Sequence, residues 1–444
     1  MDTIRGALEQ VDAIGLGYLS LDRATSTLSG GEAQRLKLVK HLGSDLTGLT
    51  HVFDEPSVGL HPRDVGRLND LLRALRDKGN TVLVVEHDPD VIAIADTIVE
   101  VGPLAGANGG ELLFEGSYGR LRAADTVTAV SLRRTGESRD SRRTATGKLP
   151  IVNASLHNLK DVSVDVPEGV LTVVTGVAGS GKSSLISETF RSLYPDAIFV
   201  DQAPISTSSR STPATYVGLL DPVRKLFAKA NDVEASLFSF NSKGACEECQ
   251  GRGVIITELS YMDPITTHCE TCDGRRFKDS VVAYQLRGRS IADVLEMSAS
   301  EAADFFTEKA LRTKLGSLID TGLGYLGLGQ SLSTLSGGER QRIKLADQLA
   351  GTGNIYILDE PTTGLHMSDI DMLLSLLHGL VDRRHTVVVI EHNLAIIQQA
   401  DWIIDLGPEG GKNGGEILFT GTPDDLATTE GSLTAAYLRR YTTI

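Results

Sequence analysis

The sequence lacks long apolar runs, a signal segment and an excess of positive charge. No apolar run reaches the roughly 18 residues that a membrane-spanning helix needs. Residues 1–5 (MDTIR) do not start a basic segment followed by an apolar stretch, so we expect no secretory signal. The formal net charge of −15 argues against a nonspecific polycation, although a local basic surface could still bind nucleic acid.

Cysteine is scarce and unevenly placed. All four cysteines lie between positions 246 and 272, whereas a disulfide framework would spread them through a small secreted chain. We therefore expect a cytoplasmic protein. Glycine, in contrast, is abundant, because 46 of 444 residues exceed the usual share of about 7%. Glycine suits a backbone that must approach a ligand closely.

An internal repeat organises the chain. The segment STLSGGE at 26–32 recurs at 333–339, and FDEP at 53–56 recurs as LDEP at 358–361. Shorter matches keep the same order: GLGYL at 15–19 and 322–326, VVEH at 84–87 and VIEH at 389–392, and GGE at 109–111 and 414–416. This recurrence indicates a duplicated module.

The two copies differ at their starts. In the second copy, residues 171–176 (LTVVTG) predict a buried strand that leads into a glycine loop, and residues 184–191 predict a helix. The first copy has no such loop before its SGG motif. We therefore divide the chain into the C-terminal part of a first module at 1–117, a basic linker at 118–150 and a second module at 151–444.

The linker prediction depends on composition. The segment 118–150 loses apolar periodicity and is rich in arginine, with Arg133, Arg134, Arg139, Arg142 and Arg143. Such a stretch is typical of a flexible, exposed linker. A nucleic-acid-binding arm is the alternative interpretation.

Residues 176–183, GVAGSGKS, have the spacing of a phosphate-binding loop. Its glycines let backbone N–H groups point at phosphate oxygens, Lys182 brings positive charge to the β and γ phosphates, and Ser183 offers a hydroxyl to Mg²⁺. The following helix turns its positive end to the same anion. The residues expected to contact ATP are Gly176, Gly179, Ser180, Gly181, Lys182, Ser183 and Ser184.

Acidic residues and a histidine end two later strands. The apolar residues 355–358 lead to Asp359, placed to hold the Mg²⁺ shell, and to Glu360, placed to orient the attacking water. His392 ends a second apolar strand, and we interpret it as a sensor of the γ-phosphate. The alternatives are acids that cap a surface strand and a structural histidine. The phosphate loop favours the catalytic interpretation.

The cysteines form two CxxC knuckles, Cys246-x2-Cys249 and Cys269-x2-Cys272. This spacing predicts a zinc ribbon at about 240–280. Four thiolates complete the tetrahedron around the metal, so the predicted Zn²⁺ is structural rather than catalytic. Four free buried cysteines and a redox pair are the alternatives, and the pairing of the knuckles disfavours both.

Basic residues surround the predicted ribbon. They are Lys243, Arg252, Arg275, Arg276, Lys278, Arg287 and Arg289. Such side chains could contact DNA phosphates, which gives salt-dependent binding that is largely independent of base sequence. A solvated charged rim is equally compatible with the charges alone.

Together these motifs resemble the ABC ATPase family, whose signature motif matches LSGGE at 28–32 and 335–339. In that family two modules face each other, and the phosphate loop of one meets the signature motif of the other. The resemblance implies that the first copy completes the nucleotide site of the second. The further residues it implicates there are Ser29, Gly30, Gly31 and Gln202. A second site would need the SGG at 336–338 and a phosphate loop that the first copy does not contain.

A duplicated ABC module with a four-cysteine ribbon before its second signature motif resembles the UvrA family of DNA-repair ATPases. The similar stretches are DQAPI at 201–205, STPATY at 211–216, LFSFN at 237–241, CEECQG at 246–251 and LSGGER at 335–340. The shortened region before Cys246 is similar to a compact branch associated with drug resistance. The resemblance implies an α/β fold of tandem P-loop ABC modules, ATP hydrolysis with Mg²⁺, and recognition of damaged or distorted double-stranded DNA in nucleotide excision repair.

The sequence also departs from that family. A first phosphate loop, a first ribbon and the region that docks the helicase UvrB are not found, which puts UvrB hand-off in doubt. A truncated, split or degenerate family member fits this pattern, and a homodimer or a partner chain could complete it. An incomplete first module should expose apolar sheet edges. Two other functions stay open: a drug-resistance or DNA-binding protein that uses nucleotide only as a conformational ligand, and a membrane-transporter motor, in which the ribbon has no role.

Overall fold

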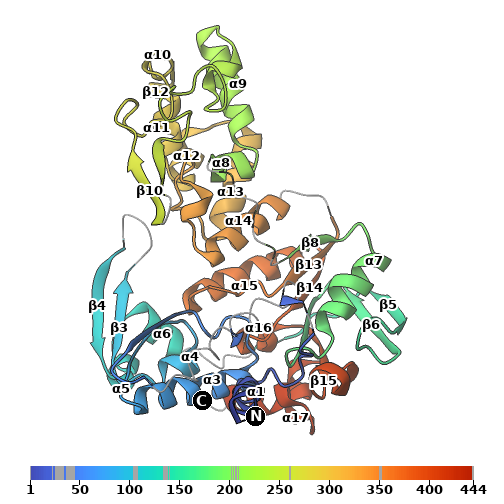
Figure 1. The fold of residues 1–444 in the computed structure, drawn as a ribbon. Helices are drawn as coiled ribbons and strands as arrows, with labels where there is room; N and C mark the ends of the chain where they lie inside the picture. The colour runs from blue at the N-terminus through green and yellow to red at the C-terminus, as the bar shows by residue number, and fades with distance from the viewer. Residues whose placement is uncertain are drawn as a thin grey trace. The chain divides into compact units, whose positions relative to one another are not determined.

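The structure is a computed structural model, which describes residues 2–22, 24–25, 35–36, 46–103, 109–133, 139, 141–201, 203, 205, 208, 210–259, 262–349 and 353–442. The chain forms two compact units (Figure 1). We call Met1–Gln202 with Gly353–Ile444 the nucleotide unit, and Ala203–Thr352 the cysteine unit. This division differs from the predicted module boundaries, because both copies contribute to the nucleotide unit and the cysteine unit is an insertion within the second copy.

A six-stranded sheet forms the centre of the nucleotide unit. Across the sheet its strands are β16 (Glu416–Gly421), β15 (Trp402–Gly407), β7 (Leu171–Gly176), β14 (Thr386–Ile390), β13 (Ile355–Asp359) and β8 (Ile198–Val200). Neighbouring strands are parallel, except that β16 pairs antiparallel with β15. Strands β7 and β14 are buried along their whole length, as their mostly apolar sequences predict for strands covered on both faces.

Helices and a strand pair cover this sheet. Helix η3 (Ser184–Phe190) directly follows the glycine loop, as predicted, and continues into α7 (Arg191–Leu193). The antiparallel strands β5 (Gly147–Ala154) and β6 (Val162–Glu168) share one hydrophobic core with η3 and the sheet. The remaining helices of the second copy are α15 (Met367–Asp382), α16 (Leu394–Gln399), α17 (Pro423–Thr428) and α18 (Leu433–Thr442).

The first copy repeats part of this architecture. Strands β1 (Thr50–Asp54) and β2 (Thr81–Val85) pair in parallel as β13 and β14 do, and β3 (Ile98–Gly102) pairs antiparallel with β4 (Glu111–Gly116) as β15 does with β16. Its helices are α1 (Asp2–Ala13), α3 (Pro62–Asp77), α4 (Pro89–Ile92), α5 (Tyr118–Arg122) and α6 (Val127–Arg133). Among the described residues, no strand joins β2 to β3 in the way that β7 joins β14 to β15.

The expected exposure of apolar residues in the first copy is confirmed. Five side chains of β1, β2 and β3 are 53–67% exposed, whereas their equivalents in β13, β14 and β15 are 0–1% exposed. The exposed residues are Val52, Leu83, Val85, Val99 and Val101, and the buried equivalents are Ile357, Val388, Ile390, Ile404 and Leu406. The second copy buries this face against β5, β6, β7 and η3. The described first copy has no such cover.

The segment at 118–150 differs from the predicted flexible linker. It contains α5 and α6, and β5 begins at Gly147. Two of its arginines are bound rather than solvated, because the guanidinium of Arg143 contacts Asp401 at 3.0 Å and Arg142 donates to the carbonyl oxygen of Gln398 at 2.7 Å. Asp401 is buried, and a buried carboxylate requires such partners. Long-range pairing of this kind leaves no periodic signal in the sequence.

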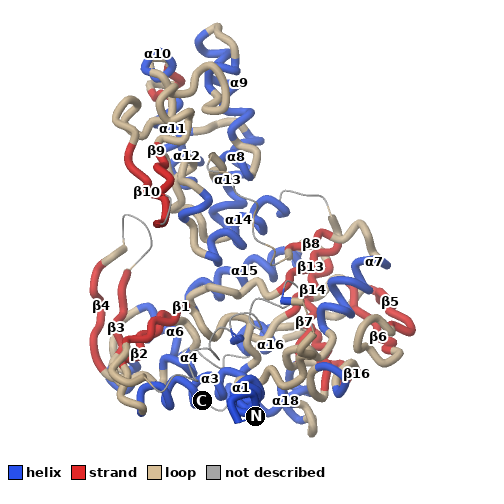
Figure 2. Tube along the Cα trace, viewed as in Figure 1, coloured by secondary structure: helices blue, strands red, loops and turns tan. Residues whose placement is uncertain are grey.

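The cysteine unit consists mainly of helices (Figure 2). Its helices are α8 (Pro213–Tyr216), α9 (Leu220–Asn231), η4 (Ala235–Phe238), α10 (Asp279–Val282), α11 (Ile291–Glu296), α12 (Ala299–Phe305), α13 (Lys309–Asp320), η5 (Leu332–Thr334) and α14 (Gly337–Leu349). Its strands form two short antiparallel pairs, β9 (Val254–Leu259) with β10 (Met262–His268) and β11 (Gln285–Leu286) with β12 (Arg289–Ser290). Capping boxes at Ser290 and Ser298 fix the starts of α11 and α12.

Candidate nucleotide site and metal centre

The glycine loop leaves β7 where only glycine fits. Gly176 has a φ of +132°, and a Cβ atom there would lie 2.1 Å from the carbonyl oxygen of Leu406. Gly181 has a φ of +107°, and its Cβ atom would lie 2.9 Å from the side chain of Leu159. The loop is therefore held close to its neighbours. Helix η3 starts at its end, so free backbone N–H groups gather where an anion would bind.

Lys182 is the buried cation of this loop. Its Nζ donates hydrogen bonds to the carbonyl oxygens of Gly176 at 2.9 Å and Val177 at 3.0 Å. Burial lowers the pKa of Lys182, and the carboxylates of Glu360 and Asp359 act against this shift. The structure thus brings the predicted lysine and the two predicted acids into one electrostatic neighbourhood.

Asp359 ends strand β13, and Glu360 follows it directly. Burial, and next the charge of Glu360, raise the pKa of Asp359 to about 7. Glu360 has a φ of +45°, a left-handed conformation that is uncommon for residues other than glycine and is often found at functional sites. A divalent cation would relieve the repulsion between the two carboxylates, so the pair suits the predicted role in holding Mg²⁺.

His392 lies beside Glu360. Its Nε2 is 3.5 Å from Glu360 Oε1, and only 6% of the side chain is exposed. Burial, and next the positive charges of Lys182 and Arg35, lower the pKa of His392 well below its usual value. The imidazole is therefore neutral near pH 7, and it can act by hydrogen bonding rather than by charge.

A buried glutamate that the sequence analysis passed over holds this histidine in place. The carboxylate of Glu391 accepts hydrogen bonds from the backbone N–H groups of Thr362 (3.0 Å), His392 (2.7 Å) and Asn393 (2.9 Å). Glu86 makes the equivalent bonds to Ser57, His87 and Asp88 in the first copy. The sequence does carry a signal for this glutamate, because both repeated segments, VVEH at 84–87 and VIEH at 389–392, contain it.

Residues of the first copy reach the nucleotide site. The ring of Tyr18 lies against the glycine loop, because a Cβ atom on Gly179 would approach it to 2.8 Å. Arg35 is 2% exposed, pairs with Asp64 at 3.6 Å and contributes to the lowered pKa of His392. Tyr18 belongs to the repeated GLGYL segment, and its role was not foreseen from sequence.

Some predicted site residues cannot be placed. Ser29, Gly30, Gly31 and Gln202 lie outside the described residues, so their proximity to the phosphate loop stays a prediction. The second SGG motif belongs to the cysteine unit, where Ser336 and Glu339 form a reciprocal cap at the start of α14. Ser183 is exposed and Ser184 is buried at the start of η3.

The first copy carries an equivalent of the Glu360–His392 pair. His87 Nε2 lies 3.6 Å from Glu55 Oε1, and Glu55 has a φ of +46°, matching Glu360. Glu55, His87, Glu360 and His392 all border one cavity of about 530 Å³ in the nucleotide unit. No phosphate loop accompanies Glu55 in the described part of the first copy.

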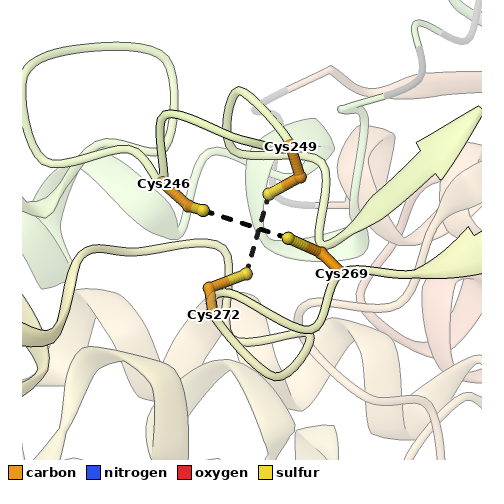
Figure 3. Close-up of side chains that lie close together, drawn as sticks. All are labelled: Cys246, Cys249, Cys269 and Cys272. Atoms are coloured by element: carbon orange, nitrogen blue, oxygen red, sulfur yellow. Dashed lines mark hydrogen bonds between the residues drawn. The ribbon is translucent and has the colours of Figure 1, made fainter.

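The four cysteines converge on one point (Figure 3). Their sulfur atoms all lie within 4.8 Å of one another, with Cys246 to Cys269 at 4.0 Å and Cys249 to Cys272 at 3.7 Å. Zn–S bonds of about 2.3 Å in a tetrahedron place sulfurs about 3.8 Å apart. All four side chains are buried, and the backbone N–H of Gly253 donates to Cys249 Sγ at 3.2 Å. The cluster therefore fits a structural zinc ion.

Comparisons with known proteins agree with this geometry. The family described as ABC transporter matches residues 159–363. UvrABC system protein A of Aquifex aeolicus is 47% identical over 465 residues, which cover 96% of this chain and 50% of that protein. The Thermus thermophilus protein of that name is 47% identical over 466 residues, with 96% and 49% covered. The crystal structure of UvrA2 from Deinococcus radiodurans matches with a TM-score of 0.93 and 42% identity, over 99% of this chain and 57% of that one.

The chain belongs to the UvrA family. Its fold is the α/β fold of tandem ABC ATPase modules, and it spans about half the length of the curated UvrA relatives it matches. Within the described residues, we find no helix with the length and apolar character needed to cross a membrane.

In this UvrA-family chain, several of the basic residues near the cysteines are paired with carboxylates or enclosed. Arg275 pairs with Asp279 at 3.1 Å, Arg287 pairs with Glu308 at 2.7 Å, and Lys278 pairs with Glu247. Arg276 is mostly enclosed: it donates to the carbonyl oxygen of Gly329 at 2.8 Å and lies over the ring of Phe240. Arg276 therefore has a structural role, whereas Lys243 and Arg289 are exposed.

Proposed function

We propose that this UvrA-family chain binds and hydrolyses ATP with Mg²⁺ and binds damaged or distorted double-stranded DNA in the cytoplasm, as part of nucleotide excision repair. The observation that supports it most is the grouping of Lys182, Asp359, Glu360 and His392 around the glycine loop. Positioning and charge stabilisation supply most of the catalysis in phosphoryl transfer, so such a grouping is the required machinery.

Each residue has a defined task in this proposal. Lys182 neutralises charge on the β and γ phosphates, while Ser183 and Asp359 hold Mg²⁺, which polarises those phosphates when bound. Glu360 orients the attacking water, and neutral His392 hydrogen-bonds to the γ-phosphate. The remaining contacts to the nucleotide come from Gly176, Gly179, Ser180, Gly181 and Ser184, from Gln202, and from Ser29, Gly30 and Gly31 of the first copy.

Substitutions in the two copies test this assignment. Lys182→Ala should abolish ATP turnover, and Glu360→Gln should retain bound ATP while losing turnover. Glu55→Gln is the matched control, because Glu55 holds the equivalent position without a described phosphate loop, and it should keep most activity. Unchanged turnover in both Lys182→Ala and Glu360→Gln would overturn the proposal.

The incomplete sheet of the first copy favours a second candidate function. A module without a described phosphate strand could serve only as a partner surface, so ATP would act as a conformational ligand for DNA binding. ATPase assays with damaged, undamaged and no DNA separate the two functions. DNA-modulated turnover supports repair, whereas ATP-dependent DNA affinity without turnover supports the second candidate. A mass measurement in solution would detect association with a partner chain, a second copy or a UvrB-type helicase as an increase in mass.

A further inference from the structure

Two histidines at equivalent positions of the two copies cap helices. These helices follow the repeated FDEP and LDEP segments in the sequence. His61 precedes α3, and its Nδ1 accepts a hydrogen bond from the N–H of Arg63 at 3.2 Å. His366 precedes α15, and its Nδ1 accepts from the N–H of Ser368 at 3.2 Å. Because Nδ1 accepts in both, a neutral ring carries its proton on Nε2, which is left to donate.

His61 of the first copy is enclosed by groups of the second copy. Its Nε2 lies 3.4 Å from Thr434 Oγ1, and Thr434 in turn donates to Asp405 Oδ1 at 3.0 Å. Its ring meets the ring of His392 edge-on, with centroids 5.7 Å apart and planes at 87°. His61, Thr434 and Asp405 are all 0–1% exposed, so this contact is shielded from water.

His366 of the second copy is half-buried and makes the corresponding contacts with the first copy. Its Nε2 lies 3.0 Å from Thr128 Oγ1, and the backbone N–H of Thr128 donates to Glu100 at 3.1 Å. Its ring meets the ring of His87 edge-on, with centroids 5.5 Å apart and planes at 85°. The contacts between the copies are therefore reciprocal.

The sequence supports this reciprocity. Thr128 and Thr434 occupy matching positions in TAVSLRR at 128–134 and TAAYLRR at 434–440. They lie on α6 and α18, which pack beside α15 and α3 respectively. The repeat thus extends beyond the GGE match. In each copy, a threonine on the helix after that match contacts the capping histidine of the other copy.

Charge does not account for the contact between His61 and His392. Burial lowers the pKa of both rings well below the usual value, and neighbouring His392, Lys182 and Arg63 lower that of His61 further. Two neutral rings that meet edge-on constrain each other by shape and packing. The position of the His61 ring, and so of the start of α3, therefore forms part of the packing around His392.

We propose that His61 is a positioning residue for His392, held by Thr434, through which the first copy controls the geometry of the nucleotide site on the second. This inference rests on the proposed ATPase function. It gives the first copy a role in hydrolysis that needs no phosphate loop of its own. Couplings of this kind pass through contiguous packed side chains, and here every link is a described contact.

Two substitutions around Asp405 separate positioning from stability. Thr434→Val removes the hydroxyl that holds His61, whereas Ser432→Ala removes the other hydrogen bond to Asp405 without touching His61. Thr434→Val should lower kcat for ATP roughly 3- to 30-fold with little change in KM, and Thr434→Ser should restore it. Ser432→Ala should lower stability but leave kcat unchanged. Equal loss of kcat in Thr434→Val and Ser432→Ala would overturn the proposal.

A second readout does not depend on turnover. Nitrogen NMR of the histidine rings, assigned with His61→Asn and His392→Asn, should show His61 as the Nε2–H tautomer near pH 7. Thr434→Val should shift the ring signals of His392, and Ser432→Ala should not. His61→Asn keeps a capping oxygen but removes the ring, so it should also lower kcat. If wild-type protein hydrolyses no ATP, the proposed function fails, and unshifted His392 signals in Thr434→Val would separately refute the positioning role.

Discussion

Two glutamate–histidine pairs with the same geometry differ in the direction of the histidine pKa shift. His392 is 6% exposed and has a lowered pKa, whereas His87 is 34% exposed and its hydrogen bond to Glu55 raises its pKa. Burial decides the difference, together with the cation Lys182, which lies near His392 only. A repeated motif therefore does not imply repeated chemistry, because the surroundings shift the pKa values of the two histidines in opposite directions.

The opposite pKa shifts predict opposite effects of pH on stability. His392 must stay neutral in the folded state, so its contribution to stability is lost as pH falls below the unfolded pKa of about 6.5, by up to about 1.4 kcal/mol per pH unit. His87 contributes stability that is present below that pKa and is lost as pH rises through its higher folded pKa.

Matched variants measure this difference. Relative to wild type, His392→Asn should gain free energy of unfolding as pH falls from 7.5 to 5.5, and His87→Asn should lose it. Urea unfolding at several pH values gives both slopes. The charged and titratable groups that face His392, namely Lys182, Arg35, Glu360 and His61, are present in both wild type and variant. Slopes of the same sign for the two variants would contradict the prediction.

The cysteine cluster predicts one bound zinc ion per chain. Four buried thiols lie within 4.8 Å of one another, and burial raises the pKa of Cys272 to about 12. Metal analysis should find about one zinc per chain. Cys249→Ser should lose it and lower the melting temperature, because metal binding is part of the folding free energy. The exposed neighbour His268→Ala is the control, and a folded protein without metal would exclude the site.

At the scale of elements, much of the fold was predictable from the sequence. The run LTVVTG followed by glycines predicted β7, its loop and η3, because strand, loop and helix each carry a local signal. The contacts of His61 with Thr434 and of Arg143 with Asp401 were not predictable. They join residues more than 200 positions apart, and buried polar pairing has no periodicity. Glu391 lies within a repeated segment, but its role could not be predicted from that segment. The role depends on the backbone N–H groups around its carboxylate, which only the structure shows.

The arginine-rich segment yields a prediction about stability. Asp401 Oδ2 accepts from the backbone N–H of Leu171 and from Arg143, both at 3.0 Å, so Arg143 ties the segment before β5 to the central sheet. Arg143→Ala removes the shorter of two arginine contacts to this buried carboxylate, since Arg139 lies 3.5 Å from Asp401, and should cost about 2–3 kcal/mol in the free energy of unfolding. Lys148→Ala removes the exposed pair with Asp165 and should cost about 0–1 kcal/mol. Equal losses in urea unfolding would show that the segment is a solvated linker.

At the scale of the whole molecule, the net charge and the exposure of basic side chains limit which residues can contact DNA. A net charge of −15 means that any DNA contact must come from a local basic surface. In the cysteine unit, four of the seven basic residues near the ribbon are engaged with carboxylates or enclosed. Lys243 and Arg289 are exposed there, so they are better candidates for phosphate contacts than Arg275 and Arg276.

DNA affinity should therefore depend on salt through a small number of contacts. Each phosphate contact adds about 0.9 to the slope of log affinity against log salt. Lys243→Ala combined with Arg289→Ala should weaken binding by a similar factor for every DNA sequence and reduce the slope by about 2. The control Lys148→Ala lies in the nucleotide unit and should change neither quantity. Fluorescence anisotropy with one labelled duplex from 50 to 200 mM salt, the range over which such contacts are screened, measures both. An unchanged slope in the double variant would place the DNA contacts on another surface of the protein.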